Sequence, residues 1–124
     1  MIVNQQLQPI LFELDPSLVI GQESVVLSRS SLGQNYPNPF NPETWIPYQL
    51  ASSEEVLVKI YDVSGHMIRQ IDVGLQSAGD YTPHDEAVYW DGRNEFGEQL
   101  SSGIYYYSIC AGEYIETRKM LLLK

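Results

Sequence analysis

Apolar and polar residues alternate along much of the chain, a pattern that is typical of β-strands with one buried face. Residues 54–62 are the clearest case, because they place Val56, Val58 and Ile60 on the same face. Further short strand-like segments occur at residues 44–50, 67–73, 87–92, 104–111 and 114–124. No segment longer than a few residues has a helical period. With turns about every 8 to 12 residues, the pattern predicts an all-β fold, an antiparallel β-sandwich of about seven strands.

Several residues within these segments can be assigned to the core or to an edge. Trp90 is expected in the core, because a buried tryptophan is a common centre of such sandwiches. Tyr105 and Tyr107 share the inward face of their segment and are expected to join it. Pro47 cannot donate a ladder hydrogen bond, so residues 44–50 should form an edge strand or the start of one. Turns or breaks are predicted at Gly65, Gly92, Gly97, Gly103 and Gly112, and a longer polar connection at residues 74–86.

Residues 35–50, NYPNPFNPETWIPYQL, combine clustered prolines with asparagines and large aromatic residues. Each proline fixes its own φ, and the residue before it is biased towards extended geometry. Asparagine side chains can bond backbone groups that have no ladder partner. We therefore expect a stiff segment that leads into the sandwich, with Phe40 filling one end of the core.

The first residues lie outside this pattern. Two short β-favouring runs, residues 9–14 and 24–28, are separated by turn signals, and residues 28–35 form a polar break. We expect residues 1–31 to be a hairpin that joins the main fold, a linker, or a remnant of a preceding domain. The main domain is expected to span residues 32–124.

Charge and cysteine content narrow the possible partners. Acidic residues outnumber basic ones 16 to 7, giving a net charge of −9, which disfavours nucleic acid or an anionic membrane surface as the main partner. The lone Cys110 excludes an internal disulfide and a cysteine-rich metal site. No stretch approaches the about 20 apolar residues of a membrane span. The N-terminus has no secretory signal pattern, so we expect an exported form to be one piece of a longer precursor.

Four segments together carry a specific resemblance. They are NYPNPFNPET with IPYQL, then VLVKIYDVSGH, then YWDGRNEFGEQLSSGIYYY, and finally TRKMLLLK. From about Leu32 to Lys124 the chain resembles the type A C-terminal sorting domain of proteins exported by type IX secretion. It is also similar to the related immunoglobulin-like domain of the flagellar hook-capping protein. The signature positions are Asn35, Pro37, Asn38, Pro39, Phe40, Asn41, Pro42, Tyr61, Asp62, Gly65, Trp90, Asp91, Gly92, Gly97, Gly103 and Tyr105.

The resemblance implies an immunoglobulin-like, non-catalytic domain without a cofactor, which follows a passenger protein and directs it across the outer membrane. Its implied partners are the outer-membrane translocon and the surface sortase that joins the passenger to lipopolysaccharide. The implied location is secreted or on the cell surface, reached through the periplasm and the outer membrane. The segment that the translocon reads would be Arg118, Lys119, Met120, Leu121, Leu122, Leu123 and Lys124. Lys119 and Lys124 match the basic positions of the family segment.

The final strand also suggests a physical mechanism. If it lies at a sheet edge, it could pair with a strand of another chain. Deleting residues 119–124 would then abolish recognition, whereas a purely structural strand would unfold the domain when deleted.

Other functions are weighed on particular residues. A structural module of an extracellular assembly could form homo-oligomers by strand exchange through residues 1–31. A carbohydrate-binding module could use the outward aromatic residues Trp45, Tyr61 and Tyr106, because flat rings stack on sugars. Cys110 lies on the outward face of its segment and could cross-link two chains on oxidation.

Metal and catalytic sites have weaker support. Asp91, Asn94, Glu95 and Glu98 could offer oxygen ligands to calcium, but they lack the EF-hand spacing. Turn formation by Asp91 is the alternative. We expect His66 and His84 to be exposed, and the adjacent Asp85 and Glu86 make a poor carboxylate pair because neighbouring side chains of an extended segment point to opposite sides. We therefore expect no enzymatic activity.

Overall fold

The alternating segments form strands in the computed structural model, which describes residues 29–124. Within this range the fold is all-β, with nine strands and no helix, so there is no helix that could span a membrane. The strands are β1 (Ser31–Leu32), β2 (Thr44–Ile46), β3 (Tyr48–Leu50), β4 (Glu54–Tyr61), β5 (Met67–Gln76), β6 (Gly79–Tyr81), β7 (Val88–Trp90), β8 (Gly103–Ala111) and β9 (Tyr114–Leu122). The expected hairpin at residues 9–14 and 24–28 lies outside the described residues.

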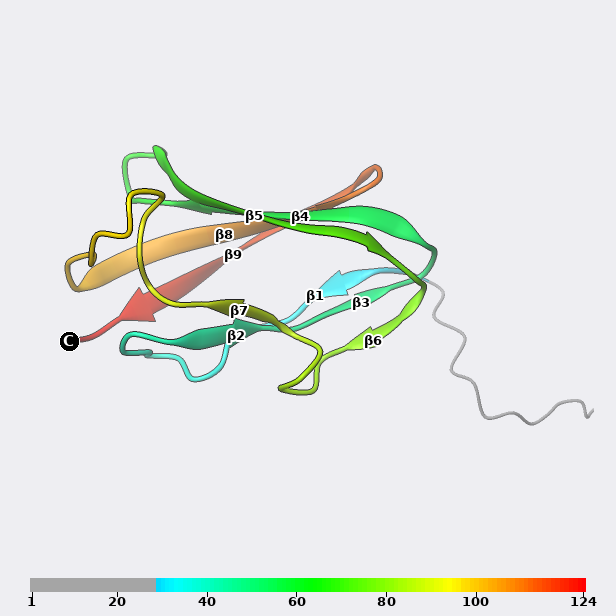
Figure 1. Cartoon of the computed structure of the whole chain (residues 1–124), viewed down its shortest axis with the longest axis horizontal. Coiled ribbons are helices and arrows are strands. Elements are labelled where there is room, and N and C mark those ends of the chain that lie inside the picture. The colour runs from blue at the N-terminus through cyan, green and yellow to red at the C-terminus, as the bar shows by residue number, and fades with distance from the viewer. Residues whose placement is uncertain (1–28) are drawn as a thin grey trace, which may run out of the picture.

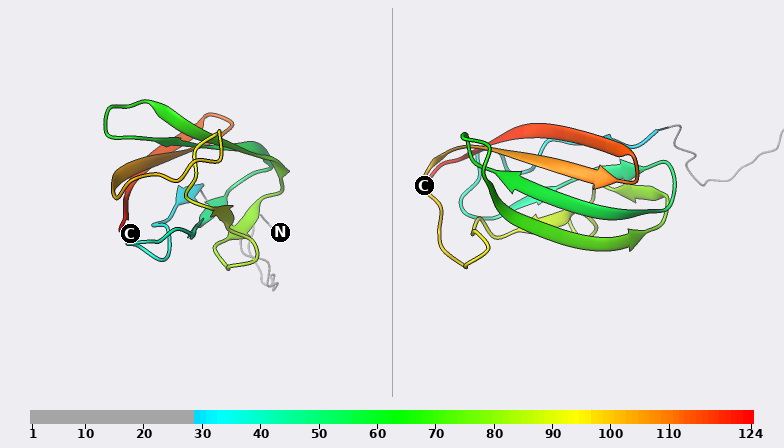
Figure 2. Two further views of the ribbon diagram at one scale, coloured as in Figure 1. Left: turned by 60° about the vertical axis from the view of Figure 1, so that its left-hand side comes forward. Right: turned by 90° about the horizontal axis from the view of Figure 1, so that it is seen from above.

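The strands form two facing layers, as Figure 1 shows. One layer is a four-stranded sheet in the order β5-β4-β8-β9, and all its pairs are antiparallel. The other contains the three-stranded sheet β1-β3-β6 and the two-stranded sheet β2-β7. Figure 2 shows the two layers obliquely and from above. The predicted β-sandwich is therefore confirmed.

The strand count exceeds the predicted seven for local reasons. Pro47 interrupts residues 44–50, so that β2 pairs with β7 while β3 pairs with β1 and β6. Since proline has no N–H to donate, the ladder breaks there, although the Pro47 carbonyl still accepts a bond from Gly33 N at 2.9 Å. The predicted polar connection contains β6, and the predicted polar break contains β1.

The core lies between the two layers and matches the predicted inward positions. Trp90 is fully buried, and the Phe40 ring centroid lies 5.6 Å from that of Trp90, so Phe40 fills one end of the core as expected. Tyr105 packs edge-on against Trp90, and Tyr107 is fully buried nearby. The other buried apolar residues are Leu32, Ile46, Tyr48, Leu50, Val56, Val58, Ile60, Val88, Ile109, Ala111, Met120 and Leu122.

Two irregularities mark β5. Its pairing with β4 shifts register between Ile60 and Tyr61 and again between Val56 and Leu57. Such β-bulges twist a strand and interrupt its ladder. Ile68 and Val73 fall at the two bulges, and both pack against the core together with Ile71, although Ile68 and Ile71 have opposite parity in the sequence.

Candidate functional site

The segment expected to be read by a translocon, residues 118–124, begins within β9 and extends two residues past its end, and β9 is an edge strand of the four-stranded sheet. Burial divides its side chains into two groups. Met120 and Leu122 belong to the core, whereas Lys119, Leu123 and Lys124 are exposed, with 51% of Leu123 accessible. Deleting residues 119–124 would therefore remove core side chains, so truncation alone cannot separate recognition from folding.

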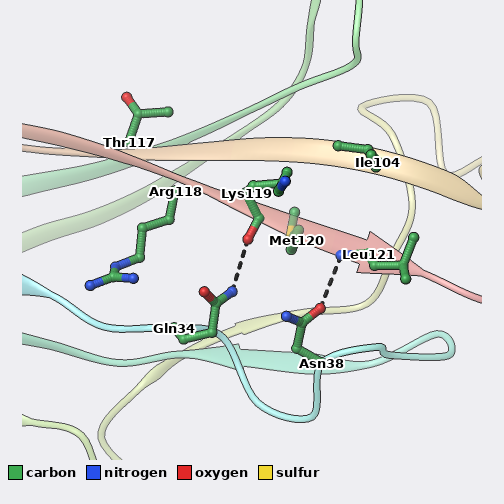
Figure 3. Close-up of a pocket in the computed structure, with 8 residues that line it drawn as sticks. All are labelled: Gln34, Asn38, Ile104, Thr117, Arg118, Lys119, Met120 and Leu121. Atoms are coloured by element: carbon green, nitrogen blue, oxygen red, sulfur yellow. Dashed lines mark hydrogen bonds between the residues drawn. The ribbon is translucent and has the colours of Figure 1, made fainter.

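The residues 34–40, which we name the strap, cover the C-terminal half of the β9 edge (Figure 3). Gln34 Nε2 donates to Lys119 O at 2.8 Å, and Asn38 Oδ1 accepts from Leu121 N at 3.0 Å. Phe40 extends this as a parallel bridge to Leu122: its N–H donates to Leu121 O, and its carbonyl accepts from Leu123 N, both at 3.0 Å. The strap thus stands in for a neighbouring strand along residues 119–123.

The N-terminal half of the same edge is open within the described residues. Ile115 is 65% exposed, Thr117 is also exposed, and no described residue bonds the backbone groups of Ile115 or Thr117 that face away from β8. A hollow of about 500 Å³ lies where the strap meets β9, and its lining residues are Gln34, Asn38, Ile104, Thr117, Arg118, Lys119, Met120 and Leu121. Of these only Thr117 and Arg118 belong to the open half of β9, so the hollow adjoins the accessible strand edge at one end.

Buried polar contacts hold the strap in place. The Tyr107 hydroxyl donates to Gly33 O at 2.7 Å and accepts from Asn35 N at 2.8 Å, and burial raises the pKa of Tyr107 to about 12. The buried Asn35 side chain donates to Thr44 Oγ1 at 2.9 Å, and Thr44 Oγ1 donates to Pro37 O at 3.1 Å. These contacts give Asn35 and Pro37 of the signature a structural role, since buried polar groups must be paired.

Arg118 connects β9 to the opposite layer. Its Nε donates to Leu32 O at 2.6 Å, and its Nε lies 3.9 Å from Glu116 Oε2. The Tyr114 hydroxyl donates to Glu116 Oε1, and burial together with this carboxylate raises the pKa of Tyr114. Glu116 and Arg118 therefore form a polar stripe on the inner side of the open edge.

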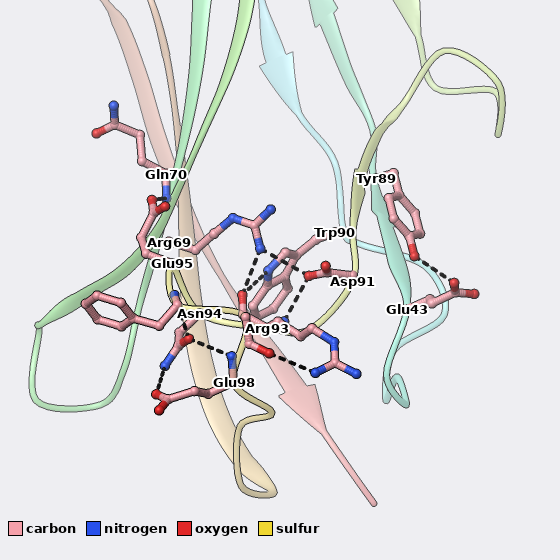
Figure 4. Close-up of polar contacts among 12 residues, drawn as sticks. Glu43, Arg69, Gln70, Tyr89, Trp90, Asp91, Arg93, Asn94, Glu95 and Glu98 are labelled. Atoms are coloured by element: carbon pink, nitrogen blue, oxygen red, sulfur yellow. Dashed lines mark hydrogen bonds and ion pairs between the residues drawn. The ribbon is translucent and has the colours of Figure 1, made fainter.

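The loop after β7 covers the start of the opposite edge of the same sheet, at β5 (Figure 4). Glu95 N donates to Ile68 O at 3.0 Å, and Glu95 Oε2 accepts from Gln70 N at 2.8 Å. Arg69 on β5 also bonds the loop, because its NH1 atom donates to Asp91 Oδ1 at 3.1 Å and to Arg93 O at 3.0 Å.

The four candidate calcium ligands lie in this loop, but their oxygens are engaged in bonds within the loop or to β5 (Figure 4). Asp91 Oδ1 accepts from Arg93 N at 3.0 Å, and Asn94 Oδ1 accepts from the N–H groups of Phe96 and Glu98 at 2.9 Å. Asn94 Nδ2 in turn donates to Glu98 Oε1 at 2.8 Å. Within residues 29–124 no three His, Cys, Asp or Glu side chains are placed to hold a metal ion. These oxygens cap turns, as proposed for Asp91, and the calcium hypothesis gains no support.

Signature residues after β4 also build a turn. Asp62 Oδ1 accepts from Ser64 N at 2.9 Å and from His66 N at 3.0 Å, and these backbone bonds, chiefly that of His66, lower the pKa of Asp62. Gly65 has a φ of 86°, which favours glycine. His66 is exposed as expected.

Glycine 92 is required by close packing rather than by the turn alone. Its φ is 78°, and a Cβ built on Gly92 would lie 2.4 Å from Pro42 O. The signature residues Pro42 and Gly92, which are distant in sequence, thus meet at the end of the sandwich. Gly97 and Gly103 also have positive φ values, at 79° and 153°.

The proposed sugar-binding surface is not assembled as expected. Trp45 lies on β2 in one layer, while Tyr61 and Tyr106 are cross-strand partners of β4 and β8 in the other. Trp45 instead contacts His84, with ring centroids 3.8 Å apart, and Tyr89, at 5.4 Å. Sequence reasoning placed His84 in an exposed loop correctly but missed its contact with Trp45.

The remaining candidates are Cys110 and the neighbouring carboxylates Asp85 and Glu86. Cys110 is a half-buried free thiol on β8, opposite Ile115. Asp85 and Glu86 are exposed beyond β6.

The family described as the FlgD Ig-like domain matches residues 41–113, which is more than half of the chain. No curated protein matches the chain.

Two solved structures from Porphyromonas gingivalis share the fold. Dimeric latent PorU is 17% identical, with a TM-score of 0.57, over 78% of this chain and 10% of PorU. PorZ, described as an essential bacterial surface component of the type-IX secretion system, is 21% identical, with a TM-score of 0.50, over 73% of this chain and 11% of PorZ. The chain thus spans about a tenth of the length of each protein. At these identities the likeness establishes the fold alone.

Proposed function

Because the chain belongs to the family of FlgD Ig-like domains, we propose that it is a non-catalytic sorting domain that directs a passenger protein to the cell surface by type IX secretion. The observation that carries the proposal is the position of the C-terminal segment. It forms an edge strand that buries Met120 and Leu122 and displays Lys119, Leu123 and Lys124. The fold shared with PorZ, a surface component of that system, supports the same proposal.

The arrangement suits recognition of a folded domain. The core-facing side chains keep β9 in register, so the exposed basic and apolar side chains are presented on a rigid strand. Recognition by a translocon would use Lys119, Lys124 and the exposed Leu123, and it would not require the domain to unfold. A sortase acting on the passenger would act outside this domain.

The test is a transplant of the whole chain behind a fluorescent reporter with a signal peptide, in a bacterium with a working type IX system. We expect the reporter on the cell surface or in the medium, and its retention when the translocon is disabled. The double variant Lys119→Gln/Lys124→Gln should strand the folded reporter in the periplasm. Lys59→Gln is the matched control, because Lys59 lies on the central strand β4 of the same sheet.

A folded wild-type domain that leaves the reporter in the periplasm would contradict the sorting proposal. Equal export of the double variant and the control would contradict the assigned role of the two lysines. The family match supports a second candidate, a structural module of an extracellular assembly, and retention of the folded reporter would favour it.

A further inference from the structure

The open part of β9 has a charge pattern that complements itself. We propose that two copies of this chain pair through the Ile115–Arg118 edge in antiparallel register, joining their four-stranded sheets across a two-fold axis centred on Thr117. This inference concerns self-association and does not rest on the sorting role.

The backbone of β9 provides the first step. Lys119 O, Leu121 N and Leu121 O bond the strap, so the odd-numbered residues direct their backbone groups away from β8. Since the direction alternates along an antiparallel ladder, Ile115 and Thr117 also point outwards. The ladder between β8 and β9 has no register shift over its length, so this edge is straight and regular. It presents unpaired donors and acceptors to another strand.

The side chains select one register. Pairing centred on Thr117 places Glu116 of each copy opposite Arg118 of the other. It also places each Ile115 opposite the aliphatic stem of Lys119. The two adjacent registers that keep the same backbone groups paired would oppose two Glu116 or two Arg118 side chains. Because opposite charges across strands stabilise a pair and like charges destabilise it, only the Thr117-centred register is favoured.

The surroundings fit a second copy as the occupant. The strap limits the open edge to a short stretch, and a short stretch is sufficient for symmetric pairing of two copies. The chain carries a net charge of −9, which opposes random association of copies, whereas this edge carries both Arg118 and Lys119. The apolar Ile115, 65% exposed, would gain cover from the partner strand.

Sedimentation equilibrium of the full chain across concentrations tests the proposal. We expect the mass to rise from 14.1 kDa towards twice that value. Glu116→Arg and Arg118→Glu should each weaken the dimer about tenfold, since two attractive pairs become repulsive. The double variant Glu116→Arg/Arg118→Glu should recover most of the lost affinity. Asp72→Arg, an equal charge change on the exposed face of β5, is the control and should leave the dimer unchanged.

A second measurement is needed because Glu116 and Arg118 also make contacts within the chain. In a Cys110→Ser background, Thr117→Cys should form a disulfide-linked dimer on mild oxidation, because residues paired across strands lie within disulfide reach. Leu75→Cys, at a position that is also exposed but lies on β5, should not.

A chain that stays monomeric at all concentrations would overturn the proposal. So would a dimer that is insensitive to the charge reversals and gives no cross-link at residue 117, since its interface would then lie elsewhere, for example in residues 1–31. Equal cross-linking at positions 75 and 117 would also overturn it.

Discussion

The four-stranded sheet ends at β5 on one side and at β9 on the other, and the two edges differ in how other segments of the chain bond them. β5 is bulged twice, and the loop after β7 bonds it through Glu95 and Arg69. β9 is regular, and only its C-terminal half is bonded by the strap. Bulges and covering loops are devices that prevent strand addition.

The difference indicates which edge is available to other chains. At β5 the loop bonds Ile68 O and Gln70 N at the start of the strand, and the bulges at Ile68 and Val73 interrupt its regular ladder. The β9 edge keeps a regular open stretch at Ile115–Arg118 and displays the basic side chains Lys119 and Lys124 beyond it. Both proposals, recognition by a translocon and pairing of two copies, use this one edge. The predictions below test the contrast, from the largest effect to the smallest.

Phe40→Ala should have the largest effect. Phe40 joins the strap to Leu122 and packs against Trp90, so its removal leaves a cavity at the end of the core. We expect a loss of about 3–5 kcal/mol in the free energy of unfolding, measured by urea denaturation. Leu75→Ala on the exposed face of β5 is the control and should change it by less than about 0.5 kcal/mol. Similar losses in both variants would remove the contrast.

Tyr107→Phe should loosen the strap without leaving a cavity. It deletes a hydroxyl that bonds Gly33 O and Asn35 N, and so leaves two buried backbone groups unpaired. We expect a loss of about 1–3 kcal/mol in the same denaturation experiment. Tyr106→Phe, on the exposed face of the same strand, should have little effect. Equal stability of the two variants would show that the strap is anchored in another way.

Alkaline pH should lower the stability of the fold by ionising the buried tyrosines, among them Tyr107, which anchors the strap. Burial raises the pKa of both Tyr107 and Tyr48 to about 12, from 10.0. Above about pH 10 the unfolded state releases protons that the folded state retains, so the stability present below that pH is lost as the pH rises towards 12. Denaturation midpoints should therefore fall between about pH 10 and pH 12. The fall should be smaller in Tyr107→Phe, and an equal fall would contradict this assignment.

Arg69→Met should open the β5 edge. It removes the ion pair with Asp91 and the bond to Arg93 O but keeps the aliphatic stem. We expect a loss of about 1 kcal/mol and faster hydrogen exchange at the Gln70 amide, which the loop protects through Glu95. Unchanged exchange at Gln70 would mean that the loop stays in place without Arg69.

Asn38→Ala should have the smallest and most local effect. It removes the acceptor of Leu121 N at an exposed position, so we expect a loss of about 0.5 kcal/mol and faster exchange of that amide. Gln34→Ala is the matched control, because Gln34 bonds a carbonyl, Lys119 O, and should leave the Leu121 amide unaffected. Equal acceleration in both variants would indicate that the strap moves as a unit.

The sequence predicted the layers of the fold better than its edges. Period-two alternation identified the inward faces of β4 and β8, and the aromatic core around Trp90 followed from residue type. Pro47 led us to expect an edge strand, or the start of one, over residues 44–50. Instead Pro47 separates β2, in a two-stranded sheet, from β3, the central strand of a three-stranded sheet. β1 and β6 are too short to show any alternation, so they were read as a polar break and a connection.

The candidate site was predicted only in part, because the strand itself has a local pattern but its position in the sheet does not. The final strand was identified as β-capable, and its place at an edge depends on the order of strands, which local pattern does not contain. The bond from Gln34 to Lys119 joins residues 85 positions apart, and nothing in the local sequence indicates it. The self-complementary placement of Glu116 and Arg118 becomes visible only once the outward-facing residues of β9 are known.

Amide hydrogen exchange of the full chain, followed by NMR at low and high protein concentration, tests the contrast between the edges most directly. The account predicts that the Thr117 amide exchanges rapidly in dilute solution and is protected as the concentration rises. It predicts that the Gln70 amide is protected at both concentrations. A Thr117 amide that is protected even in dilute solution, or that stays unprotected at high concentration, would contradict an open β9 edge that pairs with a second copy.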